Sequence, residues 1–188
     1  MLVEVLVGMI LMSIVGMLVL DGIAGGFRAQ RQLTDRSEAL SKARQAAQRI
    51  TREIREANPV LTAQAGKLVV RRSDGANGYV TTTYEQAGTV LNQTVTTTSA
   101  SGVSTTGATV PAIDSLDGTT LPFTYEQVPG YTAPAGVTLV SGSCALSGVT
   151  PLTYLPDCVG KVTLKLVRTV KNHTSVTLEA TVDLRNRS

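Results

Sequence analysis

Residues 1–22 read MLVEVLVGMILMSIVGMLVLDG, and this stretch constrains how the rest of the chain can fold. A mostly apolar run of sixteen residues without a charge extends from Val5 to Leu20, and Asp21 interrupts it. The run is slightly short of the ~20 residues that an α-helix needs to cross a bilayer, but apolar residues resume after Asp21. Glu4 precedes the run, where an ionisable group in lipid costs about 2.5 to 3.5 kcal/mol on insertion scales. The run favours a membrane-crossing helix, and Glu4 requires an explanation.

An amphipathic pattern follows the apolar run. Apolar side chains recur every three, four or seven residues, at Leu33, Leu40, Ala43, Ala47, Ile50, Ile54 and Ala57. These spacings place them on one face of an α-helix. The helix is predicted to end at Asn58, because Pro59 disfavours the helical conformation in the residue before it.

The predicted helix is too long for a globular domain to cover. From residue 5 to residue 58 it has 54 residues, which span ~80 Å at 1.5 Å per residue. Its apolar half, residues 1–27, is therefore expected to be a stalk, and its amphipathic half, residues 28–58, to pack on the remaining chain. Gly22, Gly25 and Gly26 are the predicted points of helix flexibility, since glycine weakens a helix by up to ~1 kcal/mol relative to alanine.

Beyond Pro59, apolar residues tend to alternate with polar ones, as in β-strands. Strands are predicted over residues 67–72, 79–86, 90–98, 121–127, 137–140, 161–170 and 175–184. A turn at residues 171–174 would join the last two as a hairpin. We therefore predict an α+β fold in which residues 59–188 form an antiparallel β-rich head packed on the amphipathic stripe. The Thr-rich segment 96–110 is expected to be an exposed loop or an irregular edge.

Charge is distributed unevenly along the 188 residues, although the net charge is only +3. No Lys or Arg lies between residues 73 and 160, whereas residues 161–188 carry six of them. Nucleic-acid binding through bulk charge is therefore weakly supported. The length fits one domain, or one domain with an appendage.

Cys144 and Cys158 are the two cysteines, and they belong to no CxxC pair or Cys/His cluster. We expect them to form one disulfide, which would stabilise the head by about 3 kcal/mol and would indicate an oxidising compartment. Two reduced buried thiols are the alternative.

Catalytic motifs are not evident in the sequence. His173 is the single histidine and falls in the predicted hairpin turn, while Asp114 and Asp117 fall at a strand edge and a turn. No glycine-rich phosphate loop or zinc-ligand spacing accompanies them. We predict neither an enzyme nor a cofactor or metal site.

The amino-terminal residues Leu2-Val3-Glu4-Val5-Leu6-Val7, followed by an apolar helix, resemble the mature amino terminus of type IV pilins and pseudopilins. In that family a prepilin peptidase removes a short basic leader and the new terminus is methylated. Residues 43–57 and the final strands are similar to those of J-type minor pseudopilins. Here the glutamate is the fourth residue, whereas it is the fifth in the mature family members.

The resemblance implies that Glu4 pairs with the terminal amine of a neighbouring subunit, the group that Met1 carries here, and so sets the register between stalks. It also implies storage in the cytoplasmic membrane with the head outside the cytoplasm, followed by assembly into an extracellular or periplasmic filament. The implied partners are copies of this chain or other pilins, a prepilin peptidase and the pilus assembly machinery. A major and a minor subunit both remain open.

A membrane-anchored binding module that does not polymerise is the alternative. Its head would capture a ligand, for example DNA held by basic residues near the end of the chain: Lys161, Lys165, Arg168, Lys171, Arg185 and Arg187. With few aromatic residues for base stacking, such binding would depend steeply on salt. A tethered enzyme is a third, weaker reading.

Overall fold

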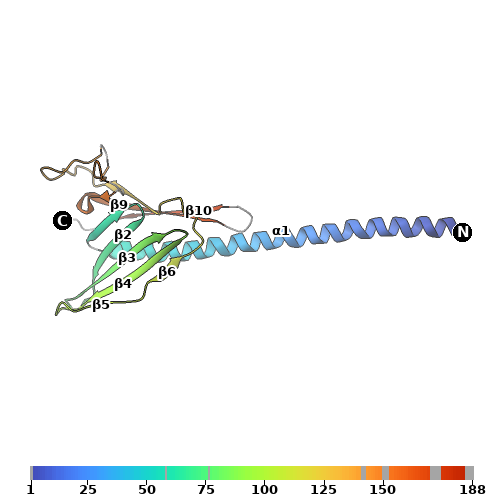
Figure 1. The fold of residues 1–188 in the computed structure, drawn as a ribbon, viewed down its shortest axis with the longest axis horizontal. Coiled ribbons are helices and arrows are strands. Elements are labelled where there is room, and N and C mark those ends of the chain that lie inside the picture. Colours follow the sequence, from blue (N-terminus) through green and yellow to red (C-terminus); the bar gives the residue numbers. More distant parts are fainter. Residues whose placement is uncertain are drawn as a thin grey trace. The chain divides into compact units, whose positions relative to one another are not determined.

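A computed structural model describes residues 2–57, 59–75, 77–140, 143–149, 153–169 and 175–184, with side chains from residue 6 onward. The chain forms two compact units, residues 1–38 and residues 39–188. A single helix, α1 (Leu2–Glu56), contributes to both, and the second unit adds antiparallel β-sheets (Figure 1). The predicted α+β class, with a long apolar N-terminal helix and an antiparallel head, is confirmed.

Helix α1 continues without interruption through Gly22, Gly25 and Gly26. It ends at Glu56, two residues before the predicted end, and the Ala57 amide donates to the Ile54 carbonyl at 3.2 Å. Asn58 lies outside the described residues. The early end agrees with the effect of Pro59, because proline restricts the backbone that precedes it.

The larger sheet has seven strands. They are β1 (Val60–Gln64), β2 (Lys67–Ser73), β3 (Tyr79–Ala87), β4 (Val90–Thr98), β5 (Ser104–Thr106), β6 (Val110–Ile113) and β8 (Thr153–Tyr154). Their order is β5-β4-β3-β2-β1-β8, and β6 pairs with β4 beside β5. Strands β1 to β4 form a meander in which each strand pairs antiparallel with the next.

The smaller sheet has three strands, β7 (Phe123–Gln127), β9 (Val159–Thr169) and β10 (Ser175–Asp183), in the order β10-β9-β7. A short 3-10 helix, η1 (Pro156–Cys158), leads into β9. Strands β9 and β10 pair along the whole of β10, with Val176 opposite Arg168 and Val182 opposite Val162. The predicted hairpin strands are thus present, and the turn at residues 171–174 lies outside the described residues.

Several predicted strand positions needed correction. Residues 137–140 do not form a strand, since Leu139 makes only an isolated bridge to Leu146. The short strands β1, β5, β6 and β8 were missed, because strands of two to five residues give too little alternation to detect. The Thr-rich segment 96–110 does form a sheet edge, in which β5 and β6 follow each other along β4.

The hydrophobic core of the second unit lies where the last turns of α1 meet the sheets (Figure 1). Ala43, Ala47, Ile50 and Ile54 are at most 4% exposed. They belong to one cluster with buried side chains of both sheets, among them Tyr84, Leu91, Phe123, Val162 and Leu166. The alanines leave room for the sheets to come close to the helix, so the predicted stripe is buried from Ala43 onward.

Candidate functional site

The main candidate site is the surface of the first unit of the chain. Its large apolar side chains are exposed along α1, and Met12 and Leu18 are 77% and 68% exposed. Helix α1 contains an 18-residue window with a mean hydropathy of 2.3, and none of that window is buried. By length and composition, the helix could cross a membrane. Exposed apolar surfaces of this kind often mark contacts with lipid or with another protein.

The structure describes only some of the predicted site residues in this unit. Glu4 lies in the helical backbone, but its side chain and Met1 lie outside what the structure describes. A Cβ atom added at Gly22, Gly25 or Gly26 would meet nothing within 4 Å. Packing within the chain therefore does not require glycine at these positions, and their predicted effect on helix flexibility stays a prediction.

Glu53 connects α1 to the larger sheet through a polar network inside the head. The Tyr84 hydroxyl donates to Glu53 Oε2 at 2.6 Å, and Gln93 Nε2 donates to the same oxygen at 3.1 Å. Arg49 Nε donates to Glu53 Oε1 at 3.3 Å from the preceding helical turn. Burial raises the pKa of Tyr84 well above its ordinary value, and the hydrogen bond to Glu53 raises it further. The network fixes the helix on strands β3 and β4.

Arg168 on β9 makes a second polar connection to α1. Its side chain is 8% exposed; Nη1 donates to the Ala39 carbonyl at 3.1 Å and Nε to the Asp114 carbonyl at 3.0 Å. Nη2 pairs with Asp114 Oδ1 at 2.8 Å. Its planar fork of donors suits this arrangement of three acceptors. Arg168 thereby joins the smaller sheet, the segment after β6 and the helix.

This position of Arg168 removes it from the suggested DNA-binding set. Lys161 pairs with Glu126, and this ion pair raises the pKa of Lys161. Among the described members of the set only Lys165 is exposed, while Lys171, Arg185 and Arg187 lie outside the described residues. The described part of the head therefore assembles no basic patch from these residues. One signal for the buried role was visible in the sequence, because Arg168 continues the alternation of Val162, Leu164 and Leu166, whose side chains point inward.

The expected disulfide is present between Cys144 and Cys158, with a Cα–Cα distance of 5.5 Å. Both cysteines are fully buried. The Leu155 amide donates to the Cys144 carbonyl at 2.8 Å inside the covalent loop. The bond therefore attaches the segment before β8 to the end of η1, directly before β9.

Asp114 and Asp117 do not form a catalytic pair. Asp114 binds Arg168, whereas Asp117 caps the turn that follows it, accepting hydrogen bonds from Thr119 and Thr120. The bonds from Thr120 lower the pKa of Asp117. Among the described residues, no group of three or more His, Cys, Asp and Glu could hold a metal ion. His173 lies outside them.

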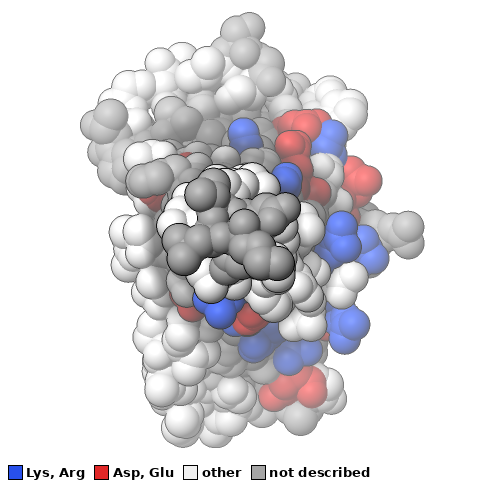
Figure 2. Space-filling model, turned by 90° about the vertical axis from the view of Figure 1, so that its right-hand side faces the viewer, with Lys and Arg blue, Asp and Glu red and all other residues white. Residues whose placement is uncertain are grey.

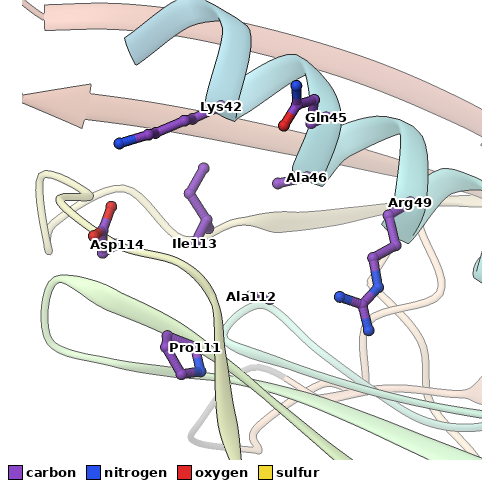
Figure 3. A pocket seen from close by; sticks show the side chains of 8 residues that line it. All are labelled: Lys42, Gln45, Ala46, Arg49, Pro111, Ala112, Ile113 and Asp114. Atoms are coloured by element: carbon purple, nitrogen blue, oxygen red, sulfur yellow. The ribbon is translucent and has the colours of Figure 1, made fainter. Parts of the chain in front are cut away.

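A groove of about 420 Å³ lies between α1 and the segment that begins with β6 (Figure 3). Lys42, Gln45, Ala46 and Arg49 line it from the helix, and residues 111–114 line it from the opposite side. The groove is open and carries charges of both signs. In Figure 2 the described Lys and Arg lie mainly toward the right of the view, and most of the described Asp and Glu lie among them. Neither feature defines a catalytic centre.

No protein-family model, no curated protein and no solved structure matches the chain. Function is therefore inferred from the geometry and chemistry described above.

Proposed function

We propose that this chain is a structural subunit of a type IV pilus-like or type II secretion filament, held in the membrane before assembly and polymerised through its N-terminal helix. The exposed apolar surface of α1 is the observation that carries this proposal. The head has its own hydrophobic core, which begins at Ala43, and its own disulfide. The apolar first part of the helix is therefore not needed to complete that core. The proposal makes the chain a structural protein and not an enzyme.

Transfer from lipid to filament is energetically reasonable for such a helix. Apolar side chains would leave lipid for a bundle of similar helices, so little hydrophobic free energy would be lost. No covalent bond would form or break in this step. Helix packing and a few polar contacts would then have to provide the specificity of assembly.

Glu4 provides one such contact in this proposal. An unpaired carboxylate in an apolar bundle is costly, but a carboxylate that meets the terminal amine of a neighbouring copy is much less so. The pair would favour assembled copies over isolated ones and would set the displacement of the one neighbour whose amine it meets.

The disulfide supports a head that lies outside the cytoplasm, either periplasmic or extracellular, because such bonds persist in oxidising compartments. The competing function, a membrane-anchored module that captures DNA, has less support. It relied on a basic set in which Arg168 is buried and Lys161 is paired with Glu126.

The substitution Glu4→Ala in the full chain tests the proposal. In cells with the assembly machinery, we expect filaments of wild-type protein and at least a tenfold loss for Glu4→Ala, because the intersubunit pair is removed. Filaments are counted by electron microscopy of sheared cell surfaces or, for a periplasmic filament, of membrane fractions. The head should stay folded, as monitored by thermal unfolding in detergent.

Glu179→Ala is the matched control, because Glu179 is an exposed carboxylate of the head. It should leave filament yield unchanged. An anchored receptor predicts a monomeric wild-type protein and no effect of either substitution. Absence of any polymer of the wild-type chain in cells that assemble other pilins would contradict the proposed function.

A further inference from the structure

Charged residues alternate in sign along one side of α1 at a constant interval. Asp21, Arg28 and Asp35 follow one another every seventh residue. Lys42 continues the alternation, although it already takes part in an interaction within its own chain. Asp21 also interrupts the apolar run, and the membrane-anchoring role described above gives no reason for a carboxylate there.

The interval has a geometric meaning. Seven residues make almost two helical turns, so these side chains lie on nearly the same face, about 10.5 Å apart along the axis. Successive members are therefore too far apart for close ion pairs within one helix. Asp21 and Arg28 are exposed, and no ion pair joins Asp21, Arg28 or Asp35 to another residue in the described part of the chain.

The residues one turn away do not neutralise the first two charges. Helical neighbours lie three and four residues away. Around Asp21 these positions hold Met17, Leu18, Ala24 and Gly25, all without charge. Around Arg28 they hold Ala24, Gly25, Arg31 and Gln32, with no acidic residue. Asp21 and Arg28 thus lack complementary charges within reach on their own helix.

We propose that this alternating stripe binds the same stripe of a second, parallel copy displaced by seven residues. This inference rests on the proposed function, because it describes the contact between assembled helices. In that displacement Asp21 of one copy lies beside Arg28 of the next, and Arg28 of the first lies beside Asp35 of the next.

Other displacements are less favourable for the same stripe. With no displacement, each charged residue lies beside the same residue of the second copy, so all contacts are between like charges. With a displacement of fourteen residues, Asp21 meets Asp35, again a like-charge contact. Because like charges at an interface cost several kcal/mol, the stripe selects an axial step of about 10.5 Å.

The proposal also accounts for Asp21 at the end of the apolar run. A carboxylate there weakens membrane insertion and is costly when unpaired in an apolar bundle. Paired with a guanidinium of the neighbouring copy, it forms a charge-assisted contact that the membrane-bound monomer lacks. Asp21 would therefore favour the assembled state over storage in lipid.

Charge reversal provides the first test. Arg28→Glu creates two like-charge contacts in the proposed arrangement, so we expect filament yield to fall by at least about tenfold. Arg36→Glu is the matched control, because the residues seven positions before and after it are Ala29 and Ala43. It makes the same change in net charge and should leave filament yield within about twofold of wild type.

Rescue separates the contact from a general effect of the substitution. The triple variant Asp21→Lys/Arg28→Glu/Asp35→Gln again places opposite charges at positions 21 and 28 of neighbouring copies and leaves no like charges in this contact. It should recover most of the filament yield. If Arg28→Glu assembles as well as Arg36→Glu, or if the triple variant assembles no better than Arg28→Glu, the proposed register is wrong.

Crosslinking measures the displacement directly. The native cysteines are bonded to each other, so introduced cysteines supply the only thiols. In filaments of Gly22→Cys/Ala29→Cys, oxidation should join position 22 of one copy to position 29 of another and produce ladders of oligomers. Filaments of Gly22→Cys alone should give few dimers, and predominant joining of position 22 to position 22 would contradict the register.

The wild-type arm distinguishes the two proposals. Wild-type filaments with no effect of charge reversal and no joining of positions 22 and 29 would overturn the register and leave the filament function standing. A wild-type chain that never polymerises would overturn both.

Discussion

The two parts of α1 have the same secondary structure and opposite environments. From residue 6 to residue 38, large apolar side chains such as Met12 are exposed, whereas Ile50 and Ile54 in the later turns are at most 1% exposed. Backbone hydrogen bonds are therefore not what separates the two parts. The difference is burial: within the second unit, the sheets cover the later turns of the helix.

The two parts of α1 also differ in the sizes of their side chains. The later turns combine small residues such as Ala43 and Ala47 with large ones, which fits a close approach of the sheets. The earlier turns carry mostly bulky apolar residues up to Leu20, and their carboxylates are Asp21, Asp35 and Glu38. Substitutions in the later turns should therefore affect folding of the head, and substitutions in the earlier turns should affect assembly.

The largest expected effect contrasts Ile54→Ala with Ile10→Ala. Ile54 is fully buried, so its truncation should lower the free energy of unfolding of the head by about 2 to 5 kcal/mol. Ile10 is 52% exposed, and its truncation should leave that free energy unchanged. Urea denaturation of the detergent-solubilised full chain measures both, and similar losses would contradict the division of the helix.

Removing the disulfide should have the next largest effect. The two cysteines are 14 residues apart, and opening a loop of this size costs about 3 kcal/mol in the loop-entropy model. The variant Cys144→Ala/Cys158→Ala should lower the urea midpoint of the head without changing membrane insertion. An unchanged midpoint would show that the bond does not support the fold.

Arg168→Leu removes the polar connection between β9 and α1. Because Arg168 makes hydrogen bonds to Ala39 and Asp114, we expect a loss of about 1 to 3 kcal/mol. Hydrogen exchange should also become faster at the amides next to Ala39. Lys165→Leu, on an exposed position of the same strand, is the control and should change neither measurement.

Tyr84→Phe should have a smaller effect, about 0.5 to 1.5 kcal/mol, because one hydrogen bond to Glu53 is lost. The pKa of Tyr84 is raised in the folded state. Its contribution to stability is therefore complete below the ordinary value of 10.0 and is lost as pH rises above it. Tyr84→Phe should accordingly weaken the alkaline loss of stability in thermal unfolding, and an identical pH profile for both proteins would contradict this role.

The smallest effect is expected at the surface of the head. Lys67 and Glu85 pair at 3.1 Å across β2 and β3, and both side chains are substantially exposed. Exposed pairs of this kind contribute about 0 to 1 kcal/mol. Glu85→Gln should therefore shift the urea midpoint very little. A loss of unfolding free energy as large as that of Arg168→Leu would contradict the small contribution assigned to this exposed pair.

Much of the fold was predictable because strong periodicity repeats over many residues. The helix, the strand pair β9 and β10, and the meander from β2 to β4 all come from such patterns. The disulfide was predictable because there are two cysteines and they form no metal-binding motif. The short strands β1, β5, β6 and β8 could not be predicted, since long-range pairing and not local propensity creates them.

The candidate site was predictable only in part. The apolar run identifies the exposed helix, but the functions of single polar residues depend on contacts distant in sequence. Arg168 was interpreted as a surface cation, yet β9 turns it inward toward Ala39, 129 residues away. Glu53 was not singled out, because its partners Tyr84 and Gln93 approach it only after the sheet has formed.

By itself, the sequence determined that a long helix exists and that exposure of its apolar first part to water is unfavourable. It also determined that charges recur along the helix every seventh residue. These properties are local, since they follow from side-chain chemistry and helical geometry. Tertiary structure alone decided where burial of α1 begins, which strands form the sheet edges and which charged side chains become internal connections. Those outcomes depend on which distant segments come together. Burial and strand pairing change the free energy of each residue, and neither can be read from the residues next to it in the sequence.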